Sequence, residues 1–103
     1  MTIIYPGAKN MAKNLIAADG TIGIRITSEV FTKALLYRFR KPIVSTSANI
    51  SGEPSPKCFA EISDTVKSAV DYVVDFRRNE TANPAPSSII KLGAGGEIQI
   101  IRK

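Results

Sequence analysis

Histidine is absent from the 103-residue sequence. Without an imidazole, the chain has no Ser-His-Asp or Cys-His nucleophile, and it lacks the ligand that most zinc sites use. Any chemistry must therefore use hydroxyls, amides, arginine, lysine, carboxylates or a bound ion. We expect neither a catalytic protein nucleophile nor a metal site made by the protein itself.

Cysteine and long apolar runs are nearly absent as well. Cys58 is the single cysteine, which excludes an internal disulfide and suits a reducing compartment. We expect it to be a small buried apolar residue. No apolar run approaches the ~18 residues that a membrane span needs, and the N-terminus lacks the layout of a signal peptide. These features predict a cytoplasmic protein with no membrane segment.

The composition that is present is typical of one ordinary globular domain. A hydrophobic content of 44% and a charged content of 22% support a modest core, and the length fits a single domain over residues 1–103. The net charge of +5 favours anionic partners such as nucleotides or RNA. Many inert domains are equally basic, so the charge alone does not select a function.

Short β-branched or alternating segments predict a series of strands. The clearest is 20–26, in which three isoleucines share one face while Thr21, Gly23 and Arg25 share the other. The glycine-rich stretch 93–96 predicts a hairpin turn between the last two strands. The predicted strands are 2–5, 20–26, 42–46, 71–76, 87–92 and 97–102.

Three segments have apolar residues at helical spacing. Residues 8–19 show this spacing only loosely, whereas 28–39 repeats it regularly, with Ser28 as the expected N-cap. A third helix is predicted over 55–70, because Pro56 suits the first helical position. Strands and helices alternate along the chain, which predicts an α/β fold in which helices flank a twisted mixed sheet.

Hydroxyl and amide side chains are concentrated in KPIVSTSANISGEPSP, residues 41–56. In an extended segment Ser45 and Ser47 point the same way, and with Asn49 they form an edge for an oxygen-rich ligand. Gly52 and the flanking prolines restrict the loop, which lowers the entropic cost of holding that edge ready. Local hydrogen bonds to the backbone of turns explain the same composition equally well.

Two arginines lie at the ends of predicted strands. Arg25 presents a planar fork suited to a carboxylate or phosphate, and Gly23 lets a group approach its strand closely. Arg102 is a second candidate anion ligand, and Ser87 follows a rigid proline lead-in. Each of these residues is also compatible with a solvent-facing position that has no function.

The polar loop predicted over 77–86 begins with Arg77 and Arg78, which we interpret as solvated surface rather than a phosphate site. Asp71 and Asp75 flank a predicted strand and are expected to be structural. No Walker-type or dinucleotide-type glycine motif is present, so a nucleotide would have to be bound in another way.

Several of these segments together resemble the YrdC family, the threonylcarbamoyl-AMP synthases. KPIVSTSANISGEPSP is similar to the family signature, and GTIGIR before it and APSSII...IIR after it are in register with the family. The resemblance covers essentially the whole chain. It implies a twisted α/β sheet around a large, positively lined cavity. It also implies a reaction that joins ATP, L-threonine and bicarbonate into threonylcarbamoyl-adenylate and releases pyrophosphate.

The resemblance further implies ligands and partners. Such a site works by placing the substrates together and stabilising developing charge, without a protein nucleophile. Magnesium accompanies the ATP, and partner proteins then transfer the threonylcarbamoyl group to tRNA. L-Threonine is implied to bind Arg25, Ser45 and Ser87. ATP is implied to bind Thr21, Ser47, Asn49, Ser55 and Arg102.

The chain departs from the family at its front. In the family, a threonine-binding segment and a lysine- and arginine-rich segment that holds the ATP phosphates precede the strand that TIIY (2–5) resembles. We therefore expect a partial YrdC-like domain that is inactive or nearly so by itself, with bare sheet edges that favour self-association. Two other functions stay open, namely a module that binds double-stranded RNA or tRNA without catalysis, and a scaffold without a ligand.

Overall fold

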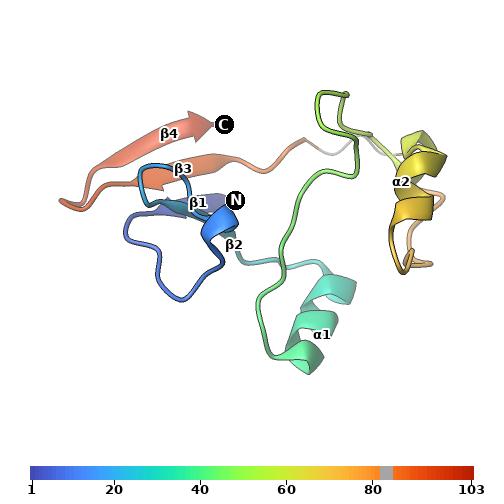
Figure 1. Cartoon of the computed structure of the whole chain (residues 1–103), viewed down its shortest axis with the longest axis horizontal. Coiled ribbons are helices and arrows are strands. Elements are labelled where there is room, and N and C mark those ends of the chain that lie inside the picture. Colours follow the sequence, from blue (N-terminus) through green and yellow to red (C-terminus); the bar gives the residue numbers. More distant parts are fainter. Residues whose placement is uncertain (82–84) are drawn as a thin grey trace. The chain divides into compact units, whose positions relative to one another are not determined.

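The computed structural model describes residues 1–81 and 85–103, which divide into two units. The sheet unit comprises Met1–Lys41 and Pro86–Lys103, and the loop unit comprises Pro42–Ala85. Residues 82–84 of the polar loop predicted over 77–86 lie outside the described residues. Figure 1 shows the four strands of the sheet unit and the helix α2 of the loop unit.

The sheet unit is built on a four-stranded sheet in the order β2-β1-β3-β4 (Figure 1). Its central strands, β1 (Thr2–Tyr5) and β3 (Ile89–Leu92), run parallel to each other. The edge strands, β2 (Ile22–Arg25) and β4 (Ile98–Arg102), are antiparallel to their neighbours. The hairpin predicted between the last two strands is thus confirmed, and so is the predicted mixed α/β sheet.

The register gives the sheet an apolar and a polar face, because cross-strand partners lie on the same side. Thr2 pairs with Arg25, and a Cβ on Gly23 would lie 3.4 Å from Cγ2 of Thr2, so these residues share one face as the sequence predicts for Gly23 and Arg25. The polar face comprises Thr2, Ile4, Gly23, Arg25, Ile89, Lys91 and Gln99. The apolar face comprises Ile3, Tyr5, Ile22, Ile24, Ile90, Leu92, Ile98 and Ile100.

Helix α1 (Val30–Phe39) forms where the apolar spacing predicts a helix, but its cap was predicted at the wrong residue. Glu29, and not Ser28, is the N-cap, because its carboxylate accepts from the N–H groups of Phe31 at 2.9 Å and Thr32 at 2.8 Å. A carboxylate at this end also suits the positive end of the helix dipole. The helix ends at Arg40, whose φ of 60° is left-handed.

Two predicted helices differ from the structure. Residues 8–19 form only one 3₁₀ turn, η1 (Lys13–Leu15), preceded by Asn10 at a φ of 57° that no helix tolerates. The helix predicted over 55–70 is replaced by a 3₁₀ turn and a shorter helix. These elements are η2 (Phe59–Glu61) and α2 (Asp64–Ala69), and α2 is capped by Ser63 rather than started at Ser55.

The strands predicted over 42–46 and 71–76 do not form in the described loop unit. A strand needs a neighbour to satisfy its backbone groups, and apolar content alone does not provide one. In the second segment, a side chain takes over that role. The guanidinium of Arg78 donates to the carbonyls of Val73 at 2.8 Å and Val74 at 3.0 Å.

Side chains are only shallowly buried throughout residues 1–81 and 85–103, and none of them is fully buried. Cys58 is half-buried, so the prediction that it is buried is wrong, and Ile26, predicted on the core side of its strand, is 91% exposed. The apolar residues at helical spacing in the segment 55–70 do come together in the loop unit, where they line a cavity of about 290 Å³; they are Phe59, Ile62, Val66 and Val70. Within the described residues, no helix has both the length and the apolar character needed to cross a bilayer.

Candidate functional site

The strand register brings Arg25 and Arg102 to the same end of the sheet. Thr2 pairs with both Arg25 and Ile89, and Ile89 in turn pairs with Arg102. The carboxyl ends of the two edge strands therefore meet the amino ends of the two central strands. A β-bulge between Ile89 and Ile90 sets the position of Arg102 in this row.

Both arginines contact Ser87, which lies just before β3. Nη1 of Arg25 donates to Ser87 Oγ at 3.2 Å. Nε and Nη2 of Arg102 donate to the Ser87 carbonyl at 2.8 and 2.5 Å. We refer to Arg25, Ser87 and Arg102 as the arginine cluster. It joins three residues that are far apart in the sequence and that the sequence analysis proposes as ligands.

The arginine cluster carries positive charge that is not neutralised locally. Within the part of the chain that the structure describes, neither guanidinium forms an ion pair with a carboxylate. Arg25 is exposed and uses one of its several N–H groups on Ser87, so the rest of its fork faces solvent. A planar fork with free donors is suited to bind a carboxylate or a phosphate.

A second polar group occupies the opposite end of the polar face. Asp19 Oδ1 accepts from the Thr21 hydroxyl at 2.6 Å and from the Thr21 backbone N–H at 3.1 Å. Asp19 Oδ2 accepts from Lys91 Nζ of β3 at 2.9 Å. These bonds, that of the Thr21 hydroxyl first, hold the pKa of the Asp19 carboxyl well below its ordinary value. We refer to these three residues as the Asp19 group.

Sequence reasoning missed Asp19 and Lys91. The segment Asp19-Gly20-Thr21 does contain a local signal, because an aspartate often accepts from the N–H two residues later in a turn. Gly20, at a φ of +79°, makes that turn accessible. The contribution of Lys91, 72 residues away, has no counterpart in the sequence pattern.

The remaining predicted ligands lie in the loop unit. Ser45, Ser47 and Ser55 are exposed, and within the described residues their hydroxyls make no hydrogen bond to protein. Asn49 is different, because its Nδ2 donates to the carbonyls of Ile50 and Glu53, both at 3.0 Å. The local interpretation of this segment therefore holds for the amide nitrogen of Asn49, whereas the serine hydroxyls stay available to a ligand.

Arg78 is more than solvated surface, contrary to the sequence interpretation. Its guanidinium carbon lies 4.9 Å from the centroid of the Phe59 ring, and Nε lies 3.4 Å from Asp75 Oδ1. Together with its bonds to Val73 and Val74, these contacts fix the segment beside the cavity of the loop unit. Arg78 has a structural role there.

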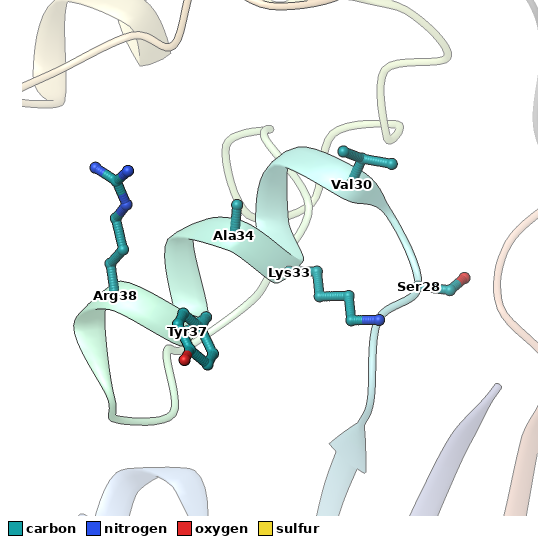
Figure 2. A pocket seen from close by; sticks show the side chains of 6 residues that line it. All are labelled: Ser28, Val30, Lys33, Ala34, Tyr37 and Arg38. Atoms are coloured by element: carbon teal, nitrogen blue, oxygen red, sulfur yellow. The ribbon is translucent and has the colours of Figure 1, made fainter.

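A larger hollow of about 490 Å³ lies beside α1 and contains none of the predicted ligand residues. Figure 2 shows its lining, all of it from α1 or from the segment just before it. The hollow is mostly apolar, and Tyr37 in its lining is 79% exposed. The arginine cluster, and not this hollow, is therefore the best candidate for a ligand site in the sheet unit. The lining residues are Ser28, Val30, Lys33, Ala34, Tyr37 and Arg38.

Comparison with known proteins decides the family. The model of the Sua5/YciO/YrdC family, described as "Telomere recombination", matches residues 1–103. The chain belongs to this family. The resemblance seen in the sequence is thereby confirmed, and no solved structure gives a significant match.

Curated relatives of this Sua5/YciO/YrdC member are named as synthases. The threonylcarbamoyl-AMP synthase of Pseudoalteromonas translucida is 35% identical over 95% of this chain and 51% of that protein. The synthase of Wigglesworthia glossinidia brevipalpis is 31% identical over 100% of this chain and 50% of the relative. A putative threonylcarbamoyl-AMP synthase of Methanocaldococcus jannaschii is 42% identical over 75% of this chain and 35% of that protein. The chain thus spans between about a third and a half of the length of these relatives.

Proposed function

We propose that this chain supplies part of the substrate site of a threonylcarbamoyl-AMP synthase. The reaction combines ATP, L-threonine and bicarbonate into threonylcarbamoyl-AMP, pyrophosphate and water. One observation carries the proposal, namely the convergence of Arg25 and Arg102 on Ser87 with no carboxylate of residues 1–81 or 85–103 paired to them. The names of the relatives support the choice of substrates.

In this proposal Arg25 holds the carboxylate of L-threonine. A guanidinium binds a carboxylate through two parallel N–H donors, and Arg25 has such donors directed away from Ser87. Ser87 keeps Arg25 in place through its hydroxyl and contacts the amino acid. Arg102, held by the Ser87 carbonyl, approaches the nucleotide from the last strand.

The loop unit contributes hydroxyls in the same proposal. Ser45 contacts threonine, while Ser47 and Ser55 contact ATP, and their freedom from protein hydrogen bonds supports these roles. Asn49 fixes the turn with its amide nitrogen, and its proposed contact with the nucleotide would use Oδ1. Among the described residues this oxygen has no hydrogen-bond partner, and because it is buried, the contact requires the loop to rearrange.

The chemistry needs positioning and charge stabilisation, and no residue of the chain forms a covalent bond to substrate. The threonine nitrogen bonds to the bicarbonate carbon while a carbon–oxygen bond of bicarbonate breaks and water leaves. An oxygen of the resulting carbamate then bonds to the α-phosphorus, and the bond from that phosphorus to the bridging oxygen breaks as pyrophosphate leaves. Arginines beside these anions lower the barrier by opposing the negative charge that gathers there. Mg²⁺ would enter on the ATP phosphates, because the described residues contain no cluster of acidic side chains to hold it. The product would pass to proteins that transfer threonylcarbamoyl to tRNA.

The direct test is L-threonine binding by calorimetry. Replacing Arg25 by alanine should weaken binding at least tenfold, or about 1.4 kcal/mol, because a charge-assisted contact is lost. Arg38→Ala on α1 is the matched control, since it removes the same charge outside the arginine cluster. Equal affinity of the two variants would refute the proposal. Salt-sensitive binding of double-stranded RNA, unaffected by threonine, would instead favour an RNA-binding module.

A further inference from the structure

The Thr21 hydroxyl has one proton, and it is donated to the Asp19 carboxylate. A hydroxyl donates one hydrogen bond and accepts up to two. Thr21 Oγ1 lies 2.6 Å from Asp19 Oδ1, the length of a charge-assisted O–H···O⁻ bond, and a carboxylate can only accept. Thr21 must therefore be the donor in this pair, and only its lone pairs remain for a ligand.

The Asp19 carboxylate is held in place from several sides. The backbone N–H of Thr21 binds the same oxygen at 3.1 Å, and Lys91 binds the other oxygen at 2.9 Å. An aspartate carboxylate is ionised at neutral pH in any case, and the same contacts lower the pKa of Asp19 further, so it keeps accepting well into the acidic range. The hydroxyl of Thr21 is consequently not free to turn its proton toward a ligand.

We propose that Asp19 is a positioning residue that makes Thr21 a hydrogen-bond acceptor, so that this position selects a nucleoside hydroxyl or amino group over a phosphate. A phosphate near neutral pH offers mainly acceptor oxygens, and it would also meet the negative charge of Asp19. Sugar hydroxyls and the adenine amino group carry the donors that Thr21 can accept. The inference rests on the proposed function, and it specifies which part of ATP Thr21 contacts.

The geometry of the sheet is consistent with separate positions for the anionic part and the nucleoside part of a ligand. Thr21 precedes Arg25 by four residues, which corresponds to roughly 13 Å along an extended strand. The arginine cluster offers positive charge at one end of the polar face, and the Asp19 group offers acceptor atoms at the other. A ligand with an anionic part and a nucleoside part can address both ends.

The test uses two probes that separate these chemical features. Adenosine carries hydroxyl and amino donors without phosphate, and inorganic tripolyphosphate carries phosphate without a nucleoside. The ¹⁵N-labelled chain is titrated with each, and the amide resonance of Thr21 is followed. Adenosine should shift this resonance, and tripolyphosphate should not. Thr21→Val should weaken adenosine binding about fivefold, while Thr21→Ser should retain it.

Variants of the Asp19 group show whether Asp19 orients the Thr21 hydroxyl or only supports the fold. Asp19→Ala frees the hydroxyl proton and removes the negative charge, so tripolyphosphate should now shift residue 21 and adenosine should bind more weakly. Lys91→Met is the matched control, because it breaks the ion pair but leaves Asp19 as acceptor, and the selectivity should persist. If Asp19 had a purely structural role, Asp19→Ala would weaken the binding of adenosine and of tripolyphosphate by the same factor.

Three results would overturn the inference. They are a Thr21 shift caused equally by tripolyphosphate in the natural chain, no shift with either probe, and unchanged selectivity in Asp19→Ala. Threonine binding through Arg25 does not use Thr21, so it decides the proposed function separately. Failure here with intact Arg25-dependent threonine binding would refute only the role of Asp19.

Discussion

Ser87 contacts the two arginines through two different atoms. Its hydroxyl accepts from Arg25 and its carbonyl accepts from Arg102, so a change of side chain affects only the first contact. This separation makes Ser87 a precise point at which to test the arginine cluster.

Ser87→Ala should weaken L-threonine binding about fivefold, since a hydrogen bond of about 1 kcal/mol is lost. Ser87→Thr should keep the hydroxyl and the affinity. Ser88→Ala is the control, because Ser88 contributes its backbone carbonyl to Thr2 rather than a side-chain contact to an arginine. Calorimetry on the three variants measures the effect, and equal affinities of Ser87→Ala and Ser88→Ala would contradict it.

The lowered pKa of Asp19 predicts how the Asp19 group responds to pH. Its pKa is lowered, chiefly by the Thr21 hydroxyl and Lys91, so its contribution is present above the ordinary aspartate pKa of about 3.9 and is lost only as pH falls through the lower folded value. The Thr21 amide resonance should therefore stay nearly constant as pH is lowered from 7 to 3, a range that includes the ordinary aspartate pKa. A midpoint near 3.9 would show that the hydrogen bonds of the Asp19 group do not hold in solution.

At the scale of single residues, the sequence indicates which side chains are candidate ligands but not which residues they contact. The fork of Arg25 and the hydroxyl of Ser87 were predictable from residue type and strand position. Their direct contact was not, because it depends on the register that pairs Thr2 with both Arg25 and Ile89. The bond between Asp19 and Lys91 depends on the same long-range pairing.

Among the elements, strands with strong local signals formed as predicted. β1, β3 and β4 are β-branched and bounded by glycine or proline, and they find partners in one sheet. The segment 71–76 has a similar composition but no partner strand within the described part of the chain, and Arg78 binds the carbonyls of Val73 and Val74 instead. Pairing is a tertiary property, which is why a strand pattern alone over-predicts strands.

The cap of α1 gives a prediction at the scale of an element. Glu29→Ala removes the carboxylate that accepts from Phe31 and Thr32, and it should destabilise the helix by about 1 kcal/mol. Loss of helical chemical shifts in residues 30–33, measured by NMR, reports the effect. Ser28→Ala is the control and should change these shifts little. A larger loss of helical chemical shifts in Ser28→Ala than in Glu29→Ala would instead identify Ser28 as the cap.

For the molecule as a whole, the exposed apolar surface predicts self-association. All five residues of the edge strand β4 are exposed, and Ile98 and Ile100 expose 68% and 61% of their surface. Unpaired edges and apolar faces of this kind favour association with a second copy. Analytical ultracentrifugation should show an average molecular mass that rises with protein concentration, and Ile100→Lys should reduce that rise. A concentration-independent monomer mass in the natural chain would contradict this expectation.

The most direct measurement of the central claim compares L-threonine with L-threoninol, which lacks the carboxylate. The side-chain Nε–H resonance of Arg25 is followed by NMR while each compound is added. L-Threonine should shift it along a saturating curve and L-threoninol should leave it in place, because in the proposed site the Arg25 guanidinium binds the carboxylate. Equal shifts with both compounds, or none with either, would contradict the claim.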